Sequence, residues 1–332
     1  MSKSERRHVP VLSQQVLEYL AVRPGGTYLD CTLGLAGHAS QVARQLGAKG
    51  RLIGLDRDPE ALKLAGERLE ALGSELGEAM PQVTLVGEAF SRVSEFVEAG
   101  TMDGLLADFG VSSMQLDQPE RGFSFQADGP LDMRQDTRQS VTAEQVVNEM
   151  DERDLANLIY EYGEERRSWR IARAIVRARP IATTGQLARV VAGCVPTIKG
   201  ERIHPATRTF QALRIHVNRE LDEIGRLLEA APKLLRPGGR IVVISFHSLE
   251  DRIAKDAMKA GVAQGFWTLL TRKPVVAREE EILENPRARS AKLRAAEMNS
   301  REQEKVVQAR EKSRRGRDAG GQSRDRRSWE IR

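Results

Sequence analysis

Alternating strand and helix signals over the first third of the chain restrict its fold more than any other feature. Short apolar runs occur in GTYLDCTLG, GRLIGLDRD, QVTLVGEAF and DGLLADFG. Helical spacing lies between the first three, and the helical segment PEALKLAGERLEALG has Pro at its start and Gly at its end. Strands that alternate with helices predict a parallel sheet covered on both faces.

The alternation stops after the fourth apolar run and resumes much later. Residues 114–205 contain only helical patterns, and HPATRTFQALRIHVNRELDEIGRLLEAAPKLL then predicts one long helix or two. The segment RPGGRIVVISFHSLEDRIAK returns to a turn, a strand and a helix. We therefore expect a discontinuous α/β domain, residues 1–113 plus 206–297, which an all-helical insert domain of residues 114–205 interrupts. For TRKPVVAREEEILENPRARSAKLRAAE we expect a loop followed by a helix.

The C-terminal tail, residues 300–332, carries the whole positive excess of the chain. The net charge is +5, and residues 301–332 hold eleven Lys and Arg against six Asp and Glu. The tail is rich in Gly, Ser and Arg and lacks a periodic apolar pattern, so we expect it to be disordered. An arm that binds nucleic acid and a solubilising end explain this composition equally well.

The rest of the composition indicates a cytoplasmic protein without a membrane partner. No apolar run approaches the roughly 20 residues that span a bilayer, and the start of the chain lacks the apolar segment of a signal peptide. The two cysteines, Cys31 and Cys194, lie far apart, which argues against a disulfide framework.

Two strand ends offer candidate ligand groups, because open α/β sheets bind ligands beyond the carboxyl ends of their strands. The first strand leads into a loop of small residues that includes Gly34, Ala36 and Gly37. The loop lacks the G-x-G-x-x-G spacing and a Walker lysine, and a purely structural turn explains it as well. Asp56 ends the second strand, where an acid can accept hydrogen bonds from ribose hydroxyls, while Asp58 precedes Pro59 as a helix cap.

Asp108 begins the triplet Asp-Phe-Gly, which also holds magnesium in protein kinases. A kinase needs V-A-I-K, H-R-D and A-P-E motifs as well, and the chain contains none of them. The later segment LLEAAPKLLRPGGRIVVISFHS resembles the corresponding part of Rossmann-like S-adenosylmethionine-dependent methyltransferases. S-adenosylmethionine has ribose and adenine but no phosphate, so it suits a loop without phosphate-binding features.

Ten sequence blocks together resemble the MraW family, the ribosomal RNA small subunit methyltransferase H family. They include DCTLGLAGH, LIGLDRDPEAL, ADFGVSSMQLD, DGPLDMR, HPATRTFQALRIHVNREL and LRPGGRIVVISFHSLEDRIAK, and the blocks cover about residues 8–297 in family order. The resemblance implies a Rossmann-like methyltransferase sheet interrupted by a helical insert for RNA. It also implies S-adenosylmethionine-dependent methylation of N4 of one cytosine in the decoding region of 16S ribosomal RNA, with the small ribosomal subunit as partner.

The resemblance carries a set of cofactor contacts onto this chain. The residues concerned are Ala36, Gly37, His38, Asp56, Phe90, Asp108 and Gln115. Ala36 stands where the family commonly has Gly, and a methyl group fits there if the backbone is not left-handed.

Candidates for the acceptor side are less specific. Cytosine N4 is a poor nucleophile, so a nearby proton acceptor would help, and Asp108 and Asp132 are the candidates. Phe123 and Phe125 could stack on an unstacked base or could anchor the insert to the core. His247 could face the acceptor, although a core or capping role explains it equally well.

Four arginines, Arg166, Arg170, Arg173 and Arg177, share one face if their segment is helical. This pattern suits RNA phosphates and is equally typical of a solvated helix face. The sequence shows no clustered His and Cys with metal-ligand spacing, so we expect no metal. A catalytically silent ribosome-assembly factor is the alternative function, and the oligomeric state stays open.

Overall fold

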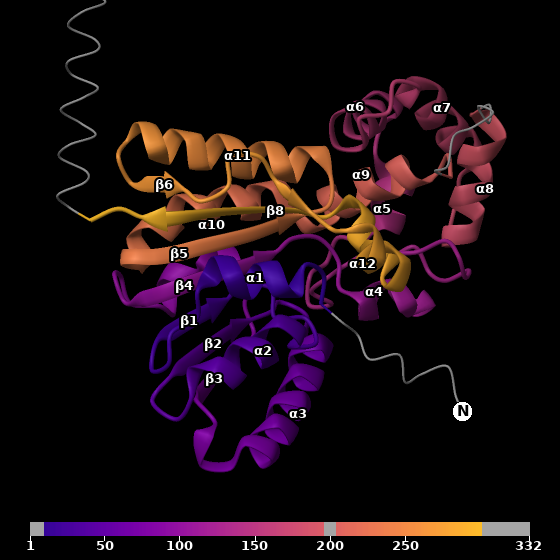
Figure 1. Ribbon diagram of the computed structural model, residues 1–332. Helices are drawn as coiled ribbons and strands as arrows, with labels where there is room; N and C mark the ends of the chain where they lie inside the picture. Colours follow the sequence, from indigo (N-terminus) through magenta and orange to yellow (C-terminus); the bar gives the residue numbers. More distant parts are fainter. Residues whose placement is uncertain (1–9, 196–203, 301–332) are drawn as a thin grey trace, which may run out of the picture.

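A computed structural model describes residues 10–195 and 204–300, and its centre is a mixed sheet (Figure 1). The strand order is β3-β2-β1-β4-β5-β8-β6, and β7 pairs with β8. Strands β1 to β5 run parallel, whereas β8 is antiparallel to β5, β6 and β7. The strands are β1 Thr27–Asp30, β2 Arg51–Leu55, β3 Gln82–Val86, β4 Met102–Asp108, β5 Leu235–Ser245, β6 Trp267–Leu269, β7 Val275–Val276 and β8 Lys292–Met298.

Helices cover both faces of this sheet, as the alternating pattern predicts. One face packs on α1 Ser13–Leu20, α2 Gly37–Leu46 and α3 Pro59–Leu76, and the other on α10 Glu220–Leu234 and α11 Ser248–Ala263. Neighbouring strand residues point to opposite cores, so Leu106 joins the first core and Leu105 the second. This explains why the strands read as continuous apolar runs. The expected Rossmann-like α/β fold is confirmed.

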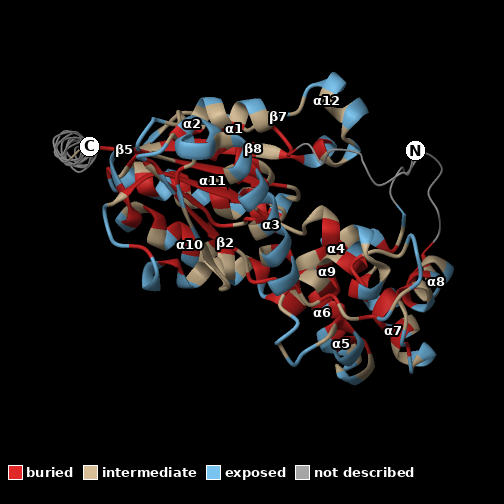
Figure 2. Cartoon of the chain, turned by 90° about the horizontal axis from the view of Figure 1, so that it is seen from below, coloured by how far each residue is buried: buried red, intermediate tan, exposed pale blue. Residues whose placement is uncertain are grey.

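A second group of helices has a hydrophobic core of its own. It comprises α5 Ala143–Glu149, α6 Glu152–Gly163, α7 Ser168–Ala178, α8 Thr184–Cys194 and α9 Thr207–Asn218. In Figure 2 the buried residues concentrate in the sheet and along the inner sides of α6, α7 and α9. The sequence predicts that α9 belongs to the α/β domain, but its buried Phe210 and Leu213 lie in this helical core. We therefore propose that the helical unit extends to about residue 218 rather than 205.

Shorter elements join these parts. They are α4 Ser113–Asp117, α12 Glu279–Glu284 and the 3₁₀ turns Gly77–Ala79, Phe90–Glu95, Pro119–Arg121 and Pro286–Ser290. The loop and helix expected for residues 271–297 are partly correct, because α12 is helical but Lys292–Met298 forms β8. Most of the C-terminal tail lies outside the described residues. Among the described residues, no helix has both the length and the apolar character that a membrane crossing requires.

Candidate functional site

A cavity of about 370 Å³ opens at the carboxyl ends of β1, β2 and β4. Its walls come from the loops that follow these strands, from the helical unit, and from the segment before β8. Six of the seven predicted cofactor residues line it: Gly37, His38, Asp56, Phe90, Asp108 and Gln115. The structure thus brings together residues that are up to about eighty positions apart, as expected for neighbouring parallel strands.

Ala36 is the exception, because it is fully buried and does not line the cavity. It precedes the first residue of α2 and adopts a left-handed conformation with φ of 56° and ψ of 34°. The condition under which a methyl group fits without strain is therefore not met. Such a conformation costs a non-glycine residue about 1–2 kcal/mol, which the surrounding packing must offset.

Asp56 is fixed by backbone amides on both sides. The N–H of Gly34 donates to Oδ2 over 2.7 Å, and the N–H of Asp58 donates to Oδ1 over 2.9 Å. Burial raises the pKa of Asp56 to about 6, although both amide hydrogen bonds act in the opposite direction. Burial likewise raises the pKa of Asp30 to about 6. The carboxylate of Asp56 keeps acceptor capacity toward the cavity and suits a ribose diol, whereas its charge would repel a phosphate.

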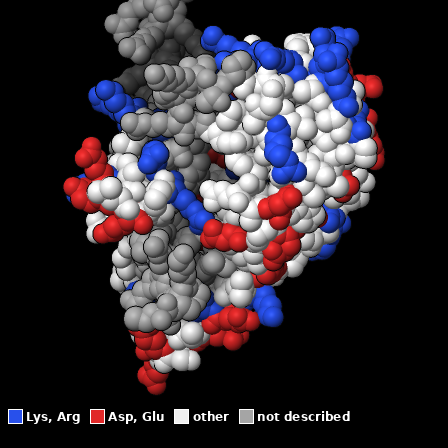
Figure 3. All heavy atoms as spheres, turned by 90° about the vertical axis from the view of Figure 1, so that its right-hand side faces the viewer, with Lys and Arg blue, Asp and Glu red and all other residues white. Residues whose placement is uncertain are grey.

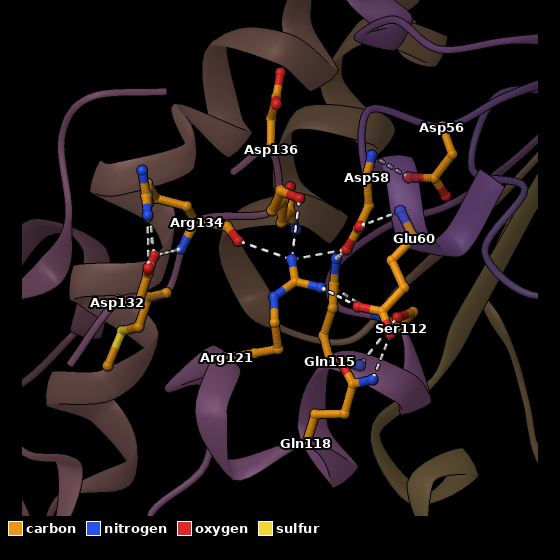
Figure 4. A network of polar contacts seen from close by, with 12 residues as sticks. Asp56, Asp58, Glu60, Ser112, Gln115, Gln118, Arg121, Asp132, Arg134 and Asp136 are labelled. Carbon is orange, nitrogen blue, oxygen red and sulfur yellow. Dashed lines mark hydrogen bonds and ion pairs between the residues drawn. The ribbon is translucent and has the colours of Figure 1, made fainter. Parts of the chain in front are cut away.

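Asp58 caps α3, as predicted, and also holds a buried network (Figure 4). Its Oδ1 accepts the N–H of Glu60, and its Oδ2 accepts Nε2 of Gln115 over 2.8 Å. The guanidinium of Arg121 lies 2.8 Å from the same Oδ2. Gln115 is therefore held by Asp58 at the edge of the cavity.

Arg121 continues this network into the helical side of the molecule. Its Nη2 donates to the carbonyl oxygens of Arg134 and Gln135, over 3.0 and 3.2 Å. The side chain is only 9% exposed and Asp58 is 1% exposed, so the ion pair is shielded from water. One buried arginine thus connects the loop after β2 with the segment that precedes the helical core.

Asp108 lies at the end of β4 opposite the start of α2. Its Oδ2 is 3.7 Å from Nε2 of His38, and its backbone N–H donates to the hydroxyl of Thr32. Its Oδ1 is buried and has no hydrogen-bond partner among the described residues. Beside it, Phe90 and Phe109 stand with ring centroids 6.2 Å apart and provide an apolar wall.

The far side of the cavity contains Gln135, Arg214 and Phe246. Arg214 lies on α9, and its Nη2 donates to Glu220 over 2.9 Å and stands 3.8 Å from Glu250. His247 does not line the cavity; it caps α11, and its Nε2 lies 3.0 Å from Glu250. Of the roles that the sequence allows for His247, the structure shows the capping role.

Glu220, His247 and Glu250 also bring three possible metal-ligand atoms within 4.8 Å of one another. The guanidinium of Arg214 already supplies a fixed positive charge to both carboxylates. A divalent cation would have to bind beside that charge. We therefore interpret this group as an ionic network.

The structure changes the interpretation of three candidates for the acceptor side. Asp132 does not line the cavity, and its carboxylate binds the guanidinium and the N–H of its neighbour Arg134 (Figure 4). Phe123 is 6% exposed and belongs to the helical core, so its ring is not available to a base. Phe125 packs against Phe210, with ring centroids 4.8 Å apart. Both phenylalanines thus anchor the helical unit.

The predicted basic stripe is partly correct. Arg170, Arg173 and Arg177 are exposed on α7, but Arg166 lies in the turn before that helix. The three helical arginines, Trp169 and Cys194 surround a hollow between α7 and α8. Arg173 pairs with Glu152 over 3.2 Å, whereas no acidic partner contacts Arg170 or Arg177 within the described chain. Figure 3 looks onto this end of the molecule, where Lys and Arg side chains gather along the upper edge.

Sequence reasoning missed Arg121, Gln135 and Arg214. Arg121 lies inside ERGFSF, Gln135 directly follows DGPLDMR, and Arg214 lies inside HPATRTFQALRIHVNREL. All three blocks carry the family resemblance. The available signal for these site residues was that each is polar and lies in or beside such a block, within a segment that reads as helix or loop.

Known proteins resemble this chain over almost its whole length. The profile of the MraW methylase family matches residues 5–299. A ribosomal RNA small subunit methyltransferase H of Acidobacterium capsulatum is 67% identical over 291 residues, which cover 88% of this chain and 98% of the relative. The protein of the same name from Koribacter versatilis is 58% identical, with 87% and 93% covered. The chain therefore belongs to the MraW methylase family and is a methyltransferase whose methyl donor is S-adenosylmethionine.

Proposed function

We propose that this enzyme methylates the exocyclic N4 amine of one cytosine in the decoding region of 16S ribosomal RNA, within the small ribosomal subunit. The family membership and the names of the relatives support a ribosomal RNA substrate. The choice of N4 and of the decoding region comes from the family resemblance. A ribosomal substrate also supports a cytoplasmic location.

We assign the cofactor to the strand-end side of the cavity. Asp56 would accept hydrogen bonds from the ribose hydroxyls, and Phe90 would lie along the adenine. Gly37, His38, Asp108 and Gln115 would surround the amino-acid end. Ala36 would act indirectly, because it sets the backbone that starts α2. The chemistry that S-adenosylmethionine supplies when bound is an electrophilic methyl group on a positively charged sulfur.

Asp108 carries the proposed chemistry of the protein itself. Asp108 lines the cavity shared by both ends of the site, and its Oδ1 lacks a partner in the described chain. A carboxylate in this position can accept a hydrogen bond from the target amine, orient it, and take its proton. The walls of the cavity exclude competing water and hold the two reactants close together. This single placement of Asp108 is the observation that carries the mechanism.

The helical unit would provide the RNA-binding surface. Trp169 is 52% exposed beside Arg170, Arg173 and Arg177. An exposed aromatic ring can stack on an unpaired base, and free guanidinium groups can neutralise phosphates. We therefore keep the three helical arginines as RNA contacts.

The test is methyl transfer from radiolabelled S-adenosylmethionine to small subunits that lack this modification, followed by nucleoside analysis. We expect the label in N4-methylcytidine. Asp108→Asn should lower kcat by about 10²–10⁴-fold, the range of general acid–base catalysis. Asp256→Asn is the matched control, because Asp256 is exposed on α11. Cofactor binding without label on either subunits or naked RNA would contradict the proposal and support a silent assembly factor.

A further inference from the structure

Two polar residues from different elements meet at the far side of the cavity. Gln135 follows the segment that Arg121 holds, and Arg214 lies on α9. The buried side chain of Asn218 connects them: its Oδ1 accepts the N–H of Gln135 over 2.7 Å, and its Nδ2 donates to the carbonyl of Arg214 over 2.9 Å. Asn218 is 1% exposed, so this connection is rigid.

Arg214 is held by charge and keeps a donor free. Glu220 binds Nη2 over 2.9 Å, and the carboxylate of Glu250 lies 3.8 Å from the same nitrogen. Its Nε is buried and has no partner among the described residues. A buried donor without a partner costs about 1–3 kcal/mol, so each such group in a native structure requires an explanation, and a functional role is one of them.

Gln135 offers a hydrogen-bond acceptor, whereas Arg214 offers only donors. Its Nε2 donates to the carbonyl of Gly110 over 3.1 Å, in the loop that follows Asp108. This bond orients the amide and leaves Oε1 as an acceptor, which no donor in the described part of the chain contacts. Both residues line the cavity, and together they supply an amide acceptor from Gln135 and a guanidinium donor group from Arg214.

We infer that Gln135 and Arg214 read the Watson–Crick edge of the target base and select cytosine. Cytosine presents an amine donor at N4 and acceptors at N3 and O2, which match Oε1 of Gln135 and the guanidinium of Arg214. Uracil presents an acceptor at O4 and a donor at N3, so both contacts would oppose like groups. This inference rests on the proposed cytosine substrate and assigns its recognition to residues of the helical unit and its entry segment.

The test combines a protein change with a change of one atom in the substrate. Arg214→Lys keeps the positive charge beside Glu220 and Glu250 but removes Nε, so the fold should persist. The substrate is a reconstituted small subunit with either cytidine or 3-deazacytidine, which lacks the N3 acceptor, at the target position. Arg208→Lys is the control, because Arg208 is exposed on the same helix and pairs with Glu165 over 3.5 Å.

With wild-type enzyme, loss of N3 should lower kcat/KM for methyl transfer by about tenfold or more. In Arg214→Lys the same change should have little further effect, because the contact is already absent. Gln135→Leu should lower kcat/KM with both substrates, while S-adenosylmethionine affinity, measured by calorimetry, stays within about twofold for all variants. If the reductions of kcat/KM caused by Arg214→Lys and by 3-deazacytidine multiply when the two changes are combined, the inference is overturned. An inactive wild type would refute the proposed function instead.

Discussion

The two ends of the cavity are built in different ways. The cofactor end consists of loops that directly follow parallel strands, and backbone amides such as those of Gly34 and Asp58 orient its carboxylate. The acceptor end consists of side chains from distant segments, which Asn218 and Arg121 hold together. The first arrangement follows from any sheet of this topology, whereas the second exists only when the helical unit has docked. Cofactor binding and base recognition should therefore respond to different mutations.

The largest expected effect comes from separating the two ends at Arg121. Arg121→Leu leaves the buried carboxylate of Asp58 without its charge partner. Breaking a buried ion pair in this way should lower the free energy of unfolding by about 3–5 kcal/mol, measured by chemical denaturation.

Two controls sharpen this prediction. Arg44→Leu removes an exposed ion pair with Glu75 and should cost less than about 1 kcal/mol. Asp58→Asn combined with Arg121→Leu should recover part of the loss, because the unpaired charge is gone while Asn still caps α3. Equal losses in Arg121→Leu and Arg44→Leu would show that Arg121 does not connect the two ends.

A pH titration tests the cofactor end alone. Burial raises the pKa of Asp56 to about 6, so the group is protonated below that pH in the free enzyme. The protonated acid cannot accept from both ribose hydroxyls, and S-adenosylmethionine affinity should fall about tenfold per pH unit below 6. Asp56→Asn should bind weakly at every pH and show no such slope, as calorimetry between pH 5 and 8 can measure.

The free energy of unfolding of the free protein should decrease as the pH rises, whereas cofactor affinity should increase. The raised pKa values of Asp56 and Asp30 mean that the folded state favours their protonated forms. Their contribution to the free energy of unfolding is complete below pH about 4 and disappears as the pH rises through 6.

Cofactor affinity that is constant from pH 5 to 8 would exclude Asp56 as the ribose acceptor.

The smallest expected effect concerns backbone strain at the cofactor end. Ala36 has φ of 56°, so Ala36→Gly should raise the free energy of unfolding by about 0.5–1 kcal/mol. Ala43→Gly, in the interior of α2, should lower it by about 1 kcal/mol, because Gly weakens a helix interior. A loss in both variants would mean that packing, rather than the backbone, determines the choice of Ala36.

The same contrast explains what the sequence could predict. Asp56 and Asp108 follow recognisable strands, so their convergence at one sheet edge needs no knowledge of distant contacts. The position of Arg214 depends on the break between α9 and α10 at Arg219, whose φ is 51°. The sequence allowed one helix or two there, and only the break brings Glu220 back to Arg214.

Strand β8 shows how tertiary context overrides local preference. Lys, Leu, Arg, Ala, Glu and Met fill Lys292–Met298, and all six residue types favour helices. The segment nevertheless forms a strand, because β5 on one side and β6 and β7 on the other pair with its backbone. Its Leu293, Ala295 and Ala296 are fully buried, and the small side chains of the two alanines let helices pack closely over the sheet.

The discontinuous sheet also determines the order in which the protein can assemble during synthesis. Strand β4 pairs with β5 through partners such as Leu105 and Ile241, and the whole helical core of residues 123–217 lies between them in the chain. The ribosome therefore releases every helix of that core before β5 exists. Until then one edge of β4 has no neighbour, and this edge can pair with another chain.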